Sequence, residues 1–431
     1  MAAIQVYGMN PLEGEISVQG SKNGALPIMA GALLHKGTTV LYNVPDIEDT
    51  RCMTDILREI GCRCEKTGSR LVIDAAFVDR TEVPGKYVKA MRSSIILLGA
   101  LLGRMKEGRC SFPGGCLIGA RPVDLHLMVL EKLGAIIEEE DGQYKAEAFN
   151  GLKGCEIELS YPSVGATEQA VLAAVLADGV TVIHNAAKEP EISQLCHFLN
   201  GMGAVICGME TEHLMVQGVK RLHDSVWKIE GDRIVAGTYS TAVMAAGGNI
   251  SFTVGPEGGF SLKEVNTKQL KLPLELLRKA GANVREEEFS LHISMKDRPK
   301  ALSVCTGPYP EFPTDLQSPF MAFLACAKGE SRIREQVFED RFGTAAALRK
   351  MGADITCKGK DAWVRGVYPL KGARVKALDL RGGAALAVAA LGAEGKTVIE
   401  DCSHIVRGYE DICRDINALG GKISWMESDT G

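Results

Sequence analysis

Residues Leu130-Glu-Lys-Leu-Gly134-Ala135 end an amphipathic stretch with a glycine, and endings of this kind occur six times in the chain. Their glycines lie between 68 and 78 residues apart (420 − 352 and 281 − 203), and they are Gly61, Gly134, Gly203, Gly281, Gly352 and Gly420. A period that covers the whole length favours six related units over the alternative of six unrelated α/β elements.

Each unit also contains an earlier helix rich in small residues, followed by glycine and a β-branched run. Residues 167–177 precede Gly179-Val-Thr-Val-Ile183, and residues 384–393 precede Gly395-Lys-Thr-Val-Ile399. A glycine after a helix supplies a left-handed C-cap at little steric cost, and the β-branched run favours a strand. The pattern therefore predicts a βαβαβ unit.

The two helices of a unit differ in composition. The alanine and glycine of the first predict a narrow helix enclosed by other backbone, whereas the second has the charged face of a surface helix. We therefore expect an α/β protein in which six units, grouped three and three, form two similar domains that face each other across a cleft. The expected domains are residues 21–231, and residues 1–20 together with 232–431, with the linker near 231–235.

Composition restricts the class of protein. With 46% hydrophobic and 24% charged residues in 431, the chain has ample material for folded cores. Its longest plain apolar stretch, Ile95 to Gly103, is about half the length of a bilayer span, and residues 1–14 lack the features of a signal peptide. We therefore expect a cytoplasmic protein. A net charge of −5 without a basic run argues against nucleic acid as a partner.

The 13 cysteines are scattered singly, which indicates reduced thiols rather than a disulfide framework. Cys62 and Cys64 form the closest pair, but neither a second pair nor a His-Glu-x-x-His motif accompanies them, so no metal site is expected. Nothing in the sequence demands a protein partner, and we expect a monomer.

A first candidate site is Ser21-Lys22-Asn23-Gly24-Ala25, at a strand-to-helix junction. Free backbone N–H groups and the helix dipole would favour a phosphate or carboxylate beside the Lys22 ammonium. Serine and asparagine also suit an ordinary helix N-cap, so these residues alone leave both interpretations open.

A second candidate is Pro113-Gly-Gly-Cys116-Leu-Ile-Gly119-Ala-Arg121-Pro122, whose three glycines indicate a lid. Cys116 would lie exposed beside the cationic Arg121, and such surroundings lower the pKa of a thiol and make it reactive. The alternative is a glycine turn that holds an inert thiol.

Other charged residues precede helices at comparable junctions. Asp315 comes directly before the small-residue helix of the fifth unit and could cap it or face the cleft as a proton acceptor. Arginines that converged from both domains would hold a highly anionic substrate, although each alone could form an ordinary surface ion pair. The arginines at these junctions are Arg92, Arg341, Arg381 of Asp379-Leu380-Arg381, and Arg407 of Arg407-Gly408-Tyr409.

Together these motifs resemble the UDP-N-acetylglucosamine 1-carboxyvinyltransferase family over the full length of the chain. The motifs that carry the resemblance are Ser21-Lys-Asn23, Pro113-Gly-Gly-Cys-Leu-Ile-Gly-Ala-Arg-Pro-Val-Asp-Leu-His126, Ser163-Val-Gly-Ala-Thr-Glu168, Phe312-Pro-Thr-Asp315 and Arg407-Gly-Tyr409. The resemblance implies an inside-out α/β barrel of two three-unit domains around buried helices. It also implies that no cofactor is needed.

The resemblance further implies a reaction, the first committed step of peptidoglycan synthesis. The sugar 3-hydroxyl adds to C2 of phosphoenolpyruvate, C3 is protonated, and phosphate leaves from a tetrahedral intermediate. By motif, Cys116 would protonate C3, could form a covalent adduct with phosphoenolpyruvate and would be the site that fosfomycin alkylates. Asp315 would take the hydroxyl proton.

The resemblance also assigns substrate contacts. Lys22, Arg121 and Arg407 would bind phosphoenolpyruvate, with Arg92 nearby, and Asp379 and Arg381 belong to the same substrate-binding set. The residues that would hold the UDP-sugar are Asn23, Arg121, Pro122, Val123, Asp124, Leu125, Ser163, Val164, Gly165, Asp315 and Val337.

Three positions depart from the family pattern. Tyr161 and Glu48 stand where members often have lysine, and Gly343 falls in Arg341-Phe-Gly-Thr344, which lacks the usual Met-His. Tyr161 and Glu48 bear on the contacts with the uracil side and on affinity, and the departure at Gly343 suits a second paralogue in an organism with two copies. Two alternatives remain: 3-phosphoshikimate 1-carboxyvinyltransferase, which uses the same chemistry on another alcohol, and a paralogue that binds the UDP-sugar with little turnover. The presence of both Cys116 and Asp315 argues against a pure binder.

Overall fold

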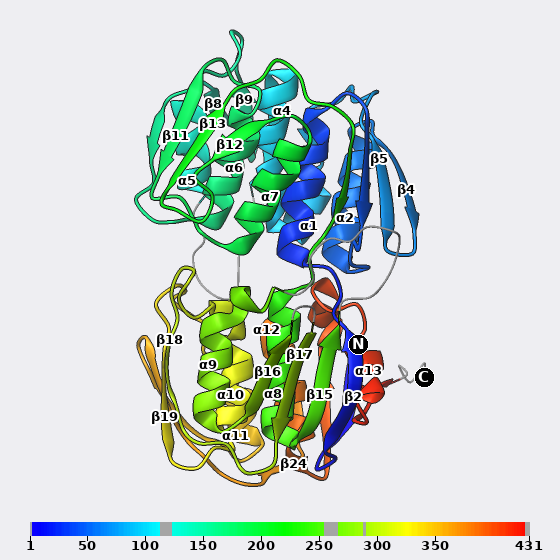
Figure 1. Cartoon of the computed structure of the whole chain (residues 1–431), viewed down its shortest axis with the longest axis vertical. Coiled ribbons are helices and arrows are strands. Elements are labelled where there is room, and N and C mark those ends of the chain that lie inside the picture. Colours follow the sequence, from blue (N-terminus) through cyan, green and yellow to red (C-terminus); the bar gives the residue numbers. More distant parts are fainter. Residues whose placement is uncertain (1, 113–122, 254–265, 288–289, 427–431) are drawn as a thin grey trace.

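The computed structural model describes residues 2–112, 123–253, 266–287 and 290–426. Within these ranges the chain forms six four-stranded mixed sheets, one two-stranded sheet and the helices that cover them, which confirms the predicted α/β class. Figure 1 shows two halves of similar build, stacked along the long axis of the molecule. No helix of the described ranges has the length and apolar character that a membrane span requires.

The four-stranded sheets share one pattern, in which a parallel pair of strands is followed by two further strands, each antiparallel to its neighbour. In spatial order, the sheets of the first half are β14 (Ser225–Lys228), β3 (Thr38–Tyr42), β5 (Arg70–Asp74) and β4 (Arg63–Thr67); β6 (Glu82–Val83), β7 (Glu107–Ser111), β9 (Gln143–Glu147) and β8 (Ile136–Glu140); and β10 (Glu156–Glu158), β11 (Val180–His184), β13 (His213–Gln217) and β12 (Val205–Cys207).

The second half repeats this pattern. Its sheets are β2 (Leu12–Ser17), β15 (Gly248–Thr253), β17 (Ser290–Met295) and β16 (Asn283–Glu287); β18 (Ser303–Cys305), β19 (Glu330–Arg334), β21 (Asp361–Arg365) and β20 (Asp354–Lys358); and β23 (Arg374–Lys376), β25 (Lys396–Glu400), β1 (Ala3–Tyr7) and β26 (Lys422–Met426). A parallel pair, β22 (Leu370–Lys371) and β24 (Ala393–Glu394), completes it.

One helix of each unit lies inside its half, enclosed by the sheets. These inner helices pack against one another through alanine, glycine and leucine, and almost all of their residues are buried. They are α1 (Lys22–Gly31), α4 (Leu97–Met105) and α6 (Val164–Ala174) in the first half, and α8 (Arg233–Ala246), α10 (Gln317–Leu324) and α12 (Leu380–Leu391) in the second. Small side chains allow the helix backbones to approach closely.

The other helices connect the strands of each unit. They are α2 (Glu48–Glu59), α3 (Gly85–Ala90), α5 (Asp124–Lys132), α7 (Pro190–Gly201), α9 (Lys271–Ala280), α11 (Thr344–Lys350) and α13 (Ile412–Ala418). Short 3₁₀ turns extend or precede several helices: η1 (Ala32–Leu34), η2 (Arg92–Ile96), η3 (Thr267–Leu270), η4 (Thr314–Leu316) and η5 (Cys402–Arg407).

The observed unit has one strand more than the predicted βαβαβ. In the unit that starts at β10 the order is β10, α6, β11, α7, β12 and β13, so a hairpin follows the second helix. The predicted unit has a single strand after the second helix, where the structure has two short ones of three and five residues. Some units also take a strand from a distant part of the chain, since β14 pairs with β3 and β2 pairs with β15.

The two halves have separate hydrophobic cores. One core runs from Ala25 to Ile229, whereas the other combines residues 4–18 with residues 234–423. The chain crosses between the halves at Gly20 and Gly231, which form an antiparallel bridge. A Cβ on Gly20 would lie 1.8 Å from the Asn43 carbonyl oxygen, so this crossing requires glycine.

Candidate active site

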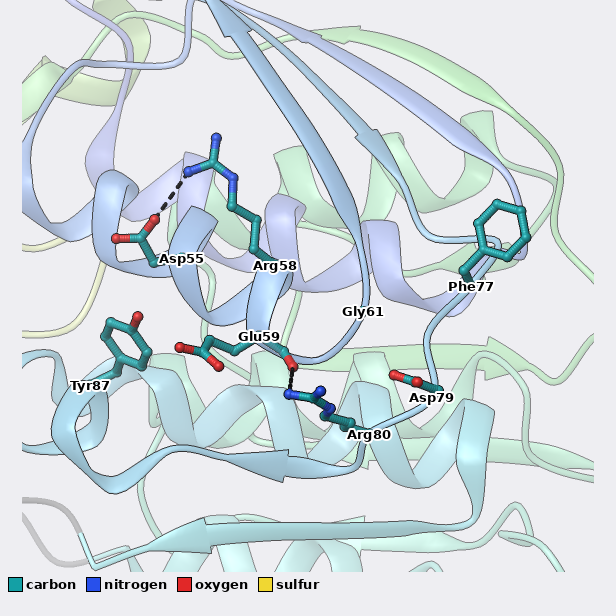
Figure 2. A pocket seen from close by; sticks show the side chains of 8 residues that line it. All are labelled: Asp55, Arg58, Glu59, Gly61, Phe77, Asp79, Arg80 and Tyr87. Atoms are coloured by element: carbon teal, nitrogen blue, oxygen red, sulfur yellow. Dashed lines mark hydrogen bonds and ion pairs between the residues drawn. The ribbon is translucent and has the colours of Figure 1, made fainter.

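A pocket of about 480 Å³ opens on the outer surface of the first half, at the C-terminal end of α2 (Figure 2). Its charges are satisfied locally, since Arg58 donates to Asp55 at 3.1 Å and Arg80 donates to the carbonyl of Glu59 at 3.2 Å. None of the site residues expected from the sequence lines it. Lys22, Arg407, Asp315 and Arg381 form ion pairs elsewhere, where the two halves face each other.

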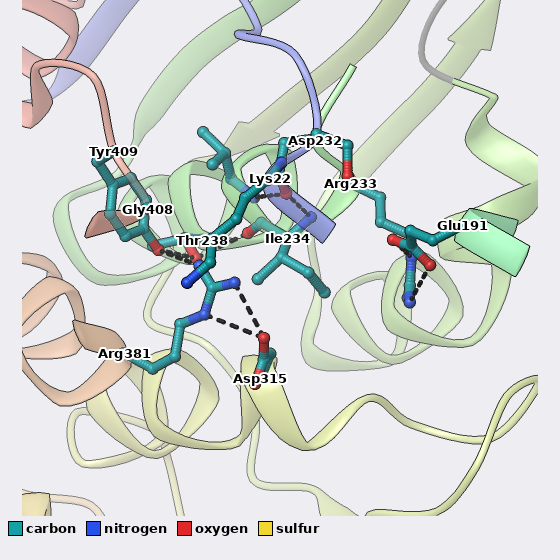
Figure 3. Close-up of polar contacts among 12 residues, drawn as sticks. Lys22, Glu191, Asp232, Arg233, Ile234, Thr238, Asp315, Arg381, Gly408 and Tyr409 are labelled. Carbon is teal, nitrogen blue, oxygen red and sulfur yellow. Dashed lines mark hydrogen bonds and ion pairs between the residues drawn. The ribbon is translucent and has the colours of Figure 1, made fainter. Parts of the chain in front are cut away.

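The N-terminal ends of several inner helices meet at this boundary (Figure 3). Asp232 caps α8, and its second carboxylate oxygen accepts a hydrogen bond from the backbone N–H of Lys22, the first residue of α1, at 3.1 Å. Arg381, in the first turn of α12, donates to Asp315, which lies in η4 directly before α10. The N-terminal end of a helix carries partial positive charge, so this arrangement favours anions between the halves.

Asp49 joins two cations from opposite halves. Its carboxylate lies 2.5 Å from Lys22 Nζ and 2.9 Å from Arg407 Nε, and the Arg407 guanidinium comes from η5 of the second half. The Asp49 side chain is 3% exposed, whereas Lys22 and Arg407 are 14% and 33% exposed. The buried carboxylate therefore holds two partly exposed cations.

The charges of this group depend on one another. Burial lowers the pKa of Lys22, and the nearby Arg407 and Arg381 lower it further, but the attraction of Asp49 opposes them. Burial by itself would raise the pKa of Asp49, but Lys22 and Arg407 outweigh it and bring this pKa below its usual value. Asp49 therefore keeps both cations charged in a place that disfavours isolated charge.

Asp315 has the opposite arrangement. Arg381 donates to one carboxylate oxygen from Nη2 at 2.9 Å and from Nε at 3.2 Å, and Arg341 donates to the other at 3.1 Å. Both guanidinium groups are 4% exposed, whereas the Asp315 side chain is 28% exposed. Leu316 occupies the N-cap of α10, so Asp315 does not cap that helix. Two buried cations thus hold an accessible carboxylate.

Tyr409 contacts Arg381 and thereby helps to hold the group formed by Asp315, Arg341 and Arg381. Its hydroxyl lies 3.5 Å from Arg381 Nη1 and 2.9 Å from Thr238 Oγ1, and the tyrosine is 1% exposed. The Arg381 guanidinium also lies 5.8 Å from the centre of the Tyr409 ring. These contacts restrict the side chain of Arg381 and so fix the position of Asp315.

Carboxylates and a guanidinium link the halves on another side of the boundary. Arg233 of the second half donates to both oxygens of Glu191 in the first, at 3.0 and 3.1 Å, and the backbone N–H of Tyr309 donates to Glu189 at 3.2 Å. Burial, together with Glu191 and Glu189, raises the pKa of the nearby Glu168 to about 8. Glu168 is therefore largely protonated at neutral pH.

Other residues expected from the sequence take local structural positions. Ser21 and Ser163 cap α1 and α6, Asp379 caps α12, and Asn23 and Asp124 are exposed near the starts of α1 and α5. The remaining positions are Arg92 in η2, Val123 and Leu125 around the start of α5, Val164 and Gly165 in the first turn of α6, and Val337 just after β19. Cys116, Arg121 and Pro122 lie outside the described residues.

The sequence did not point to Asp49, Asp232 or Arg233. Asp49 follows Glu48 in the first turn of an amphipathic helix, where an acidic residue is ordinarily a solvated partner of the helix dipole. Asp232 and Arg233 lie in the segment interpreted only as a linker. The available signal was the position of both residues at the start of an inner helix, the same position that drew attention to Lys22.

Comparison with known proteins identifies the family of the chain. The family model described as EPSP synthase (3-phosphoshikimate 1-carboxyvinyltransferase) matches residues 6–416. The chain belongs to this family. Within the EPSP synthase family it is 45% identical, over 98% of its own length and 99% of the relative's, to UDP-N-acetylglucosamine 1-carboxyvinyltransferase 2 of Caldanaerobacter subterraneus subsp. tengcongensis. The resemblance noted in the sequence motifs is thereby confirmed.

Solved structures of the family share the fold. The enolpyruvyl transferase NikO from Streptomyces tendae matches with a TM-score of 0.88 at 26% identity, over 99% of both chains. EPSP synthase from Acinetobacter baumannii matches with a TM-score of 0.75 at 18% identity, over 99% of this chain and 100% of its own, and shows likeness of fold alone. The EPSP synthase fold thus extends over almost the whole chain.

Proposed function

We propose that the chain transfers the enolpyruvyl group of phosphoenolpyruvate to the 3-hydroxyl of UDP-N-acetylglucosamine and releases phosphate, the reaction that begins peptidoglycan synthesis. The observation that carries the proposal is the 45% identity, over 98% of the chain, to a UDP-N-acetylglucosamine 1-carboxyvinyltransferase. The two charged groups at the boundary between the halves suit the two demands of this reaction: a seat for a highly anionic substrate and an acceptor for a hydroxyl proton.

The anion seat is proposed at Lys22 and Arg407. Phosphoenolpyruvate carries a phosphate and a carboxylate, and these two cations reach solvent from opposite halves while Asp49 lies buried behind them. The first turn of α1 adds the positive end of a helix dipole. Cations held in place before the reaction stabilise the charge that develops on phosphoenolpyruvate, without reorganisation in the transition state.

Asp315 is proposed as the general base. Its exposed carboxylate takes the proton of the sugar 3-hydroxyl as the oxygen forms a bond to C2 of phosphoenolpyruvate, and C3 gains a proton from Cys116. In the second step C3 returns a proton to the Cys116 thiolate, the electrons of that C–H bond form the double bond to C2, and phosphate leaves with the electron pair of the C2–O bond, which gives the enol ether. Arg341 and Arg381 keep the Asp315 carboxylate in position for the first step.

The remaining substrate contacts rest on the motifs. Arg121 and Arg92 join the anion seat, and Asp379 and Arg381 complete the second half's share of the substrate site. The residues proposed to hold the UDP-sugar are Asn23, Arg121, Pro122, Val123, Asp124, Leu125, Ser163, Val164, Gly165, Asp315 and Val337. Those that the structure describes lie near the starts of α1, α5 and α6, in η4 and after β19.

The finer description of the fold belongs to the same proposal. Residues 21–231 would form one three-unit domain and residues 1–20 with 232–431 the other, each an inside-out α/β barrel around its inner helices. Two cores without a common residue, and a double crossing at Gly20 and Gly231, support this division. We further propose a cytoplasmic monomer, because both substrates are phosphorylated metabolites and no part of the proposed chemistry calls on a second subunit.

Phosphate release tests the proposed function. Purified protein is assayed with phosphoenolpyruvate and either UDP-N-acetylglucosamine or shikimate 3-phosphate, beside a Cys116→Ala variant. We expect release that requires the UDP-sugar and is lost in the variant. Release with shikimate 3-phosphate alone would assign the other carboxyvinyl transfer. Binding of UDP-N-acetylglucosamine without release by the wild-type protein would identify a non-catalytic paralogue.

A further inference from the structure

A buried carboxylate, Glu335, lies directly after β19 and is 1% exposed. Its Oε1 accepts hydrogen bonds from the Thr306 hydroxyl at 2.8 Å and from the backbone N–H groups of Val337 and Phe338 at 2.8 and 3.1 Å. Its Oε2 accepts from the Thr314 hydroxyl at 2.9 Å. Four donors therefore converge on one side chain, which no step of the proposed reaction uses.

These donors come from three separate segments of the second half. Thr306 follows β18, Val337 and Phe338 follow β19, and Thr314 opens η4. β18 and β19 are parallel neighbours, so their C-terminal ends lie at the same edge of the sheet. Thr306 completes the junction, since its hydroxyl also accepts from the backbone N–H of Gln336 at 2.9 Å.

The three segments carry two residues with proposed roles in the reaction. Asp315, the proposed base, directly follows Thr314, and Val337, a proposed contact of the UDP-sugar, donates its own N–H to Glu335. Glu335 also contributes to the raised pKa of Tyr161, after burial and Glu189, so the junction lies within electrostatic reach of the first half just before Ser163. The carboxylate thus lies behind the part of the second half that would meet the sugar nucleotide.

We propose that Glu335 is a positioning residue that fixes the spacing between Val337 and Asp315, and with it the sugar hydroxyl that the base can reach. A charged acceptor strengthens each of its hydrogen bonds relative to a neutral one. Without it, the turn at 335–338 and the start of η4 would move independently. This inference rests on the proposed function, because it assigns Val337 and Asp315 to the sugar and its hydroxyl.

The test compares Glu335→Ala and Glu335→Gln by steady-state phosphate release, with the concentrations of UDP-N-acetylglucosamine and phosphoenolpyruvate varied in turn. For Glu335→Ala we expect KM for the UDP-sugar to rise about tenfold or more, kcat to fall, and KM for phosphoenolpyruvate to stay within about twofold. Glu335→Gln keeps an acceptor and should restore part of the loss. Glu330→Gln is the matched control, because Glu330 is an exposed carboxylate on the same strand, β19.

A purely structural role gives a different pattern. It would lower the unfolding temperature and the fraction of active enzyme while leaving both KM values unchanged, and that result would overturn the inference. Equal increases in both KM values would overturn it too. If Glu335→Ala does not fold, Thr314→Val removes one of the four donors and should shift KM for the UDP-sugar in the same direction. Failure of the wild-type enzyme to turn over the UDP-sugar would reject the proposed function instead.

Discussion

Asp49 and Asp315 each bind two cations, but a different member of each group is buried. At Asp49 it is the carboxylate, and at Asp315 it is the two cations. At Asp49 the carboxylate is 3% exposed and its cations, Lys22 and Arg407, reach solvent. At Asp315 the carboxylate is 28% exposed, and both of its cations, Arg341 and Arg381, are 4% exposed. The same set of charges thus leaves cations accessible at one place and a carboxylate accessible at the other.

The difference teaches how one boundary can serve two chemical purposes. A buried carboxylate fixes partly exposed cations, which suits the binding of a phosphate or carboxylate. Buried cations fix an exposed carboxylate, which suits the acceptance of a proton. Because every buried charge in each group has an oppositely charged partner, both groups can lie between the same two halves without an unpaired buried charge.

The largest effect is expected when the exposed carboxylate loses its charge. Asp315→Asn keeps the size of the side chain but removes the proposed proton acceptor, so phosphate release should fall by roughly 10²- to 10⁴-fold. KM for phosphoenolpyruvate should change little, because this substrate is proposed to bind at Lys22 and Arg407. Asp361→Asn, which breaks an Asp–Arg pair with Arg332 on the outer sheet, serves as the control. Retention of more than about a tenth of the wild-type rate would contradict a role as base.

A smaller effect, dependent on pH, is expected at Asp49. Burial lowers the pKa of Lys22 and Asp49 opposes this, so Asp49→Asn should make Lys22 lose its proton at a lower pH. KM for phosphoenolpyruvate should then rise at alkaline pH, about tenfold by pH 9 and less at pH 7. Steady-state assays across this range check the shift.

The matched control for Asp49 is Asp46→Asn. Asp46 lies just before the same helix and also holds two cations, Arg51 and Lys66, but it is exposed. Its loss should leave the pH dependence of KM unchanged. If both variants raise KM for phosphoenolpyruvate equally at alkaline pH, the effect is caused by the general charge of this region and not by the buried group.

The two arginines at Asp315 are expected to differ from each other. Arg381 uses two N–H donors on one oxygen and also reaches Tyr409, whereas Arg341 uses one. Lysine offers a point charge without the planar fork, so Arg381→Lys should reduce kcat about tenfold or more and Arg341→Lys only a few-fold. Equal losses, measured by phosphate release, would show that charge alone and not geometry holds Asp315.

The smallest effect concerns stability and not turnover. Glu168 has a pKa of about 8 in the folded state against a usual value of 4.5. Between these values the folded protein keeps a proton that the unfolded chain releases, so the free energy of unfolding should decrease as pH rises from about 5 to 8. Glu168→Gln should remove a few kcal/mol of this decrease. Urea unfolding at both pH values measures it, with the exposed Glu158→Gln as control, and an unchanged slope would contradict the assignment.

Much of the fold and part of the site could be predicted because their signals are local. The glycine endings and the small-residue helices are repeated within single units, and Lys22 and Asp315 stand at the starts of inner helices. Local patterns failed for the second strand of each hairpin, where a run of three to five residues carries too little periodicity.

Residues whose role depends on the other half could not be predicted. Asp49 lies on an ordinary amphipathic helix, and its contact with Arg407, 358 residues away, forms only in the folded protein. Glu335 likewise has no recognisable signal in the sequence, because its partners come from three segments that only the folded sheet brings together. Their chemistry belongs to tertiary contacts and not to any motif.

Calorimetric binding of phosphoenolpyruvate to the Asp315→Asn and Asp49→Asn variants, beside their rates of phosphate release, tests the division between the two groups most directly. The account predicts that Asp315→Asn binds phosphoenolpyruvate like the wild-type enzyme but does not turn over. It predicts that Asp49→Asn binds phosphoenolpyruvate weakly at alkaline pH and recovers turnover when the substrate is raised. Loss of phosphoenolpyruvate binding in Asp315→Asn, with normal binding in Asp49→Asn, would contradict the account.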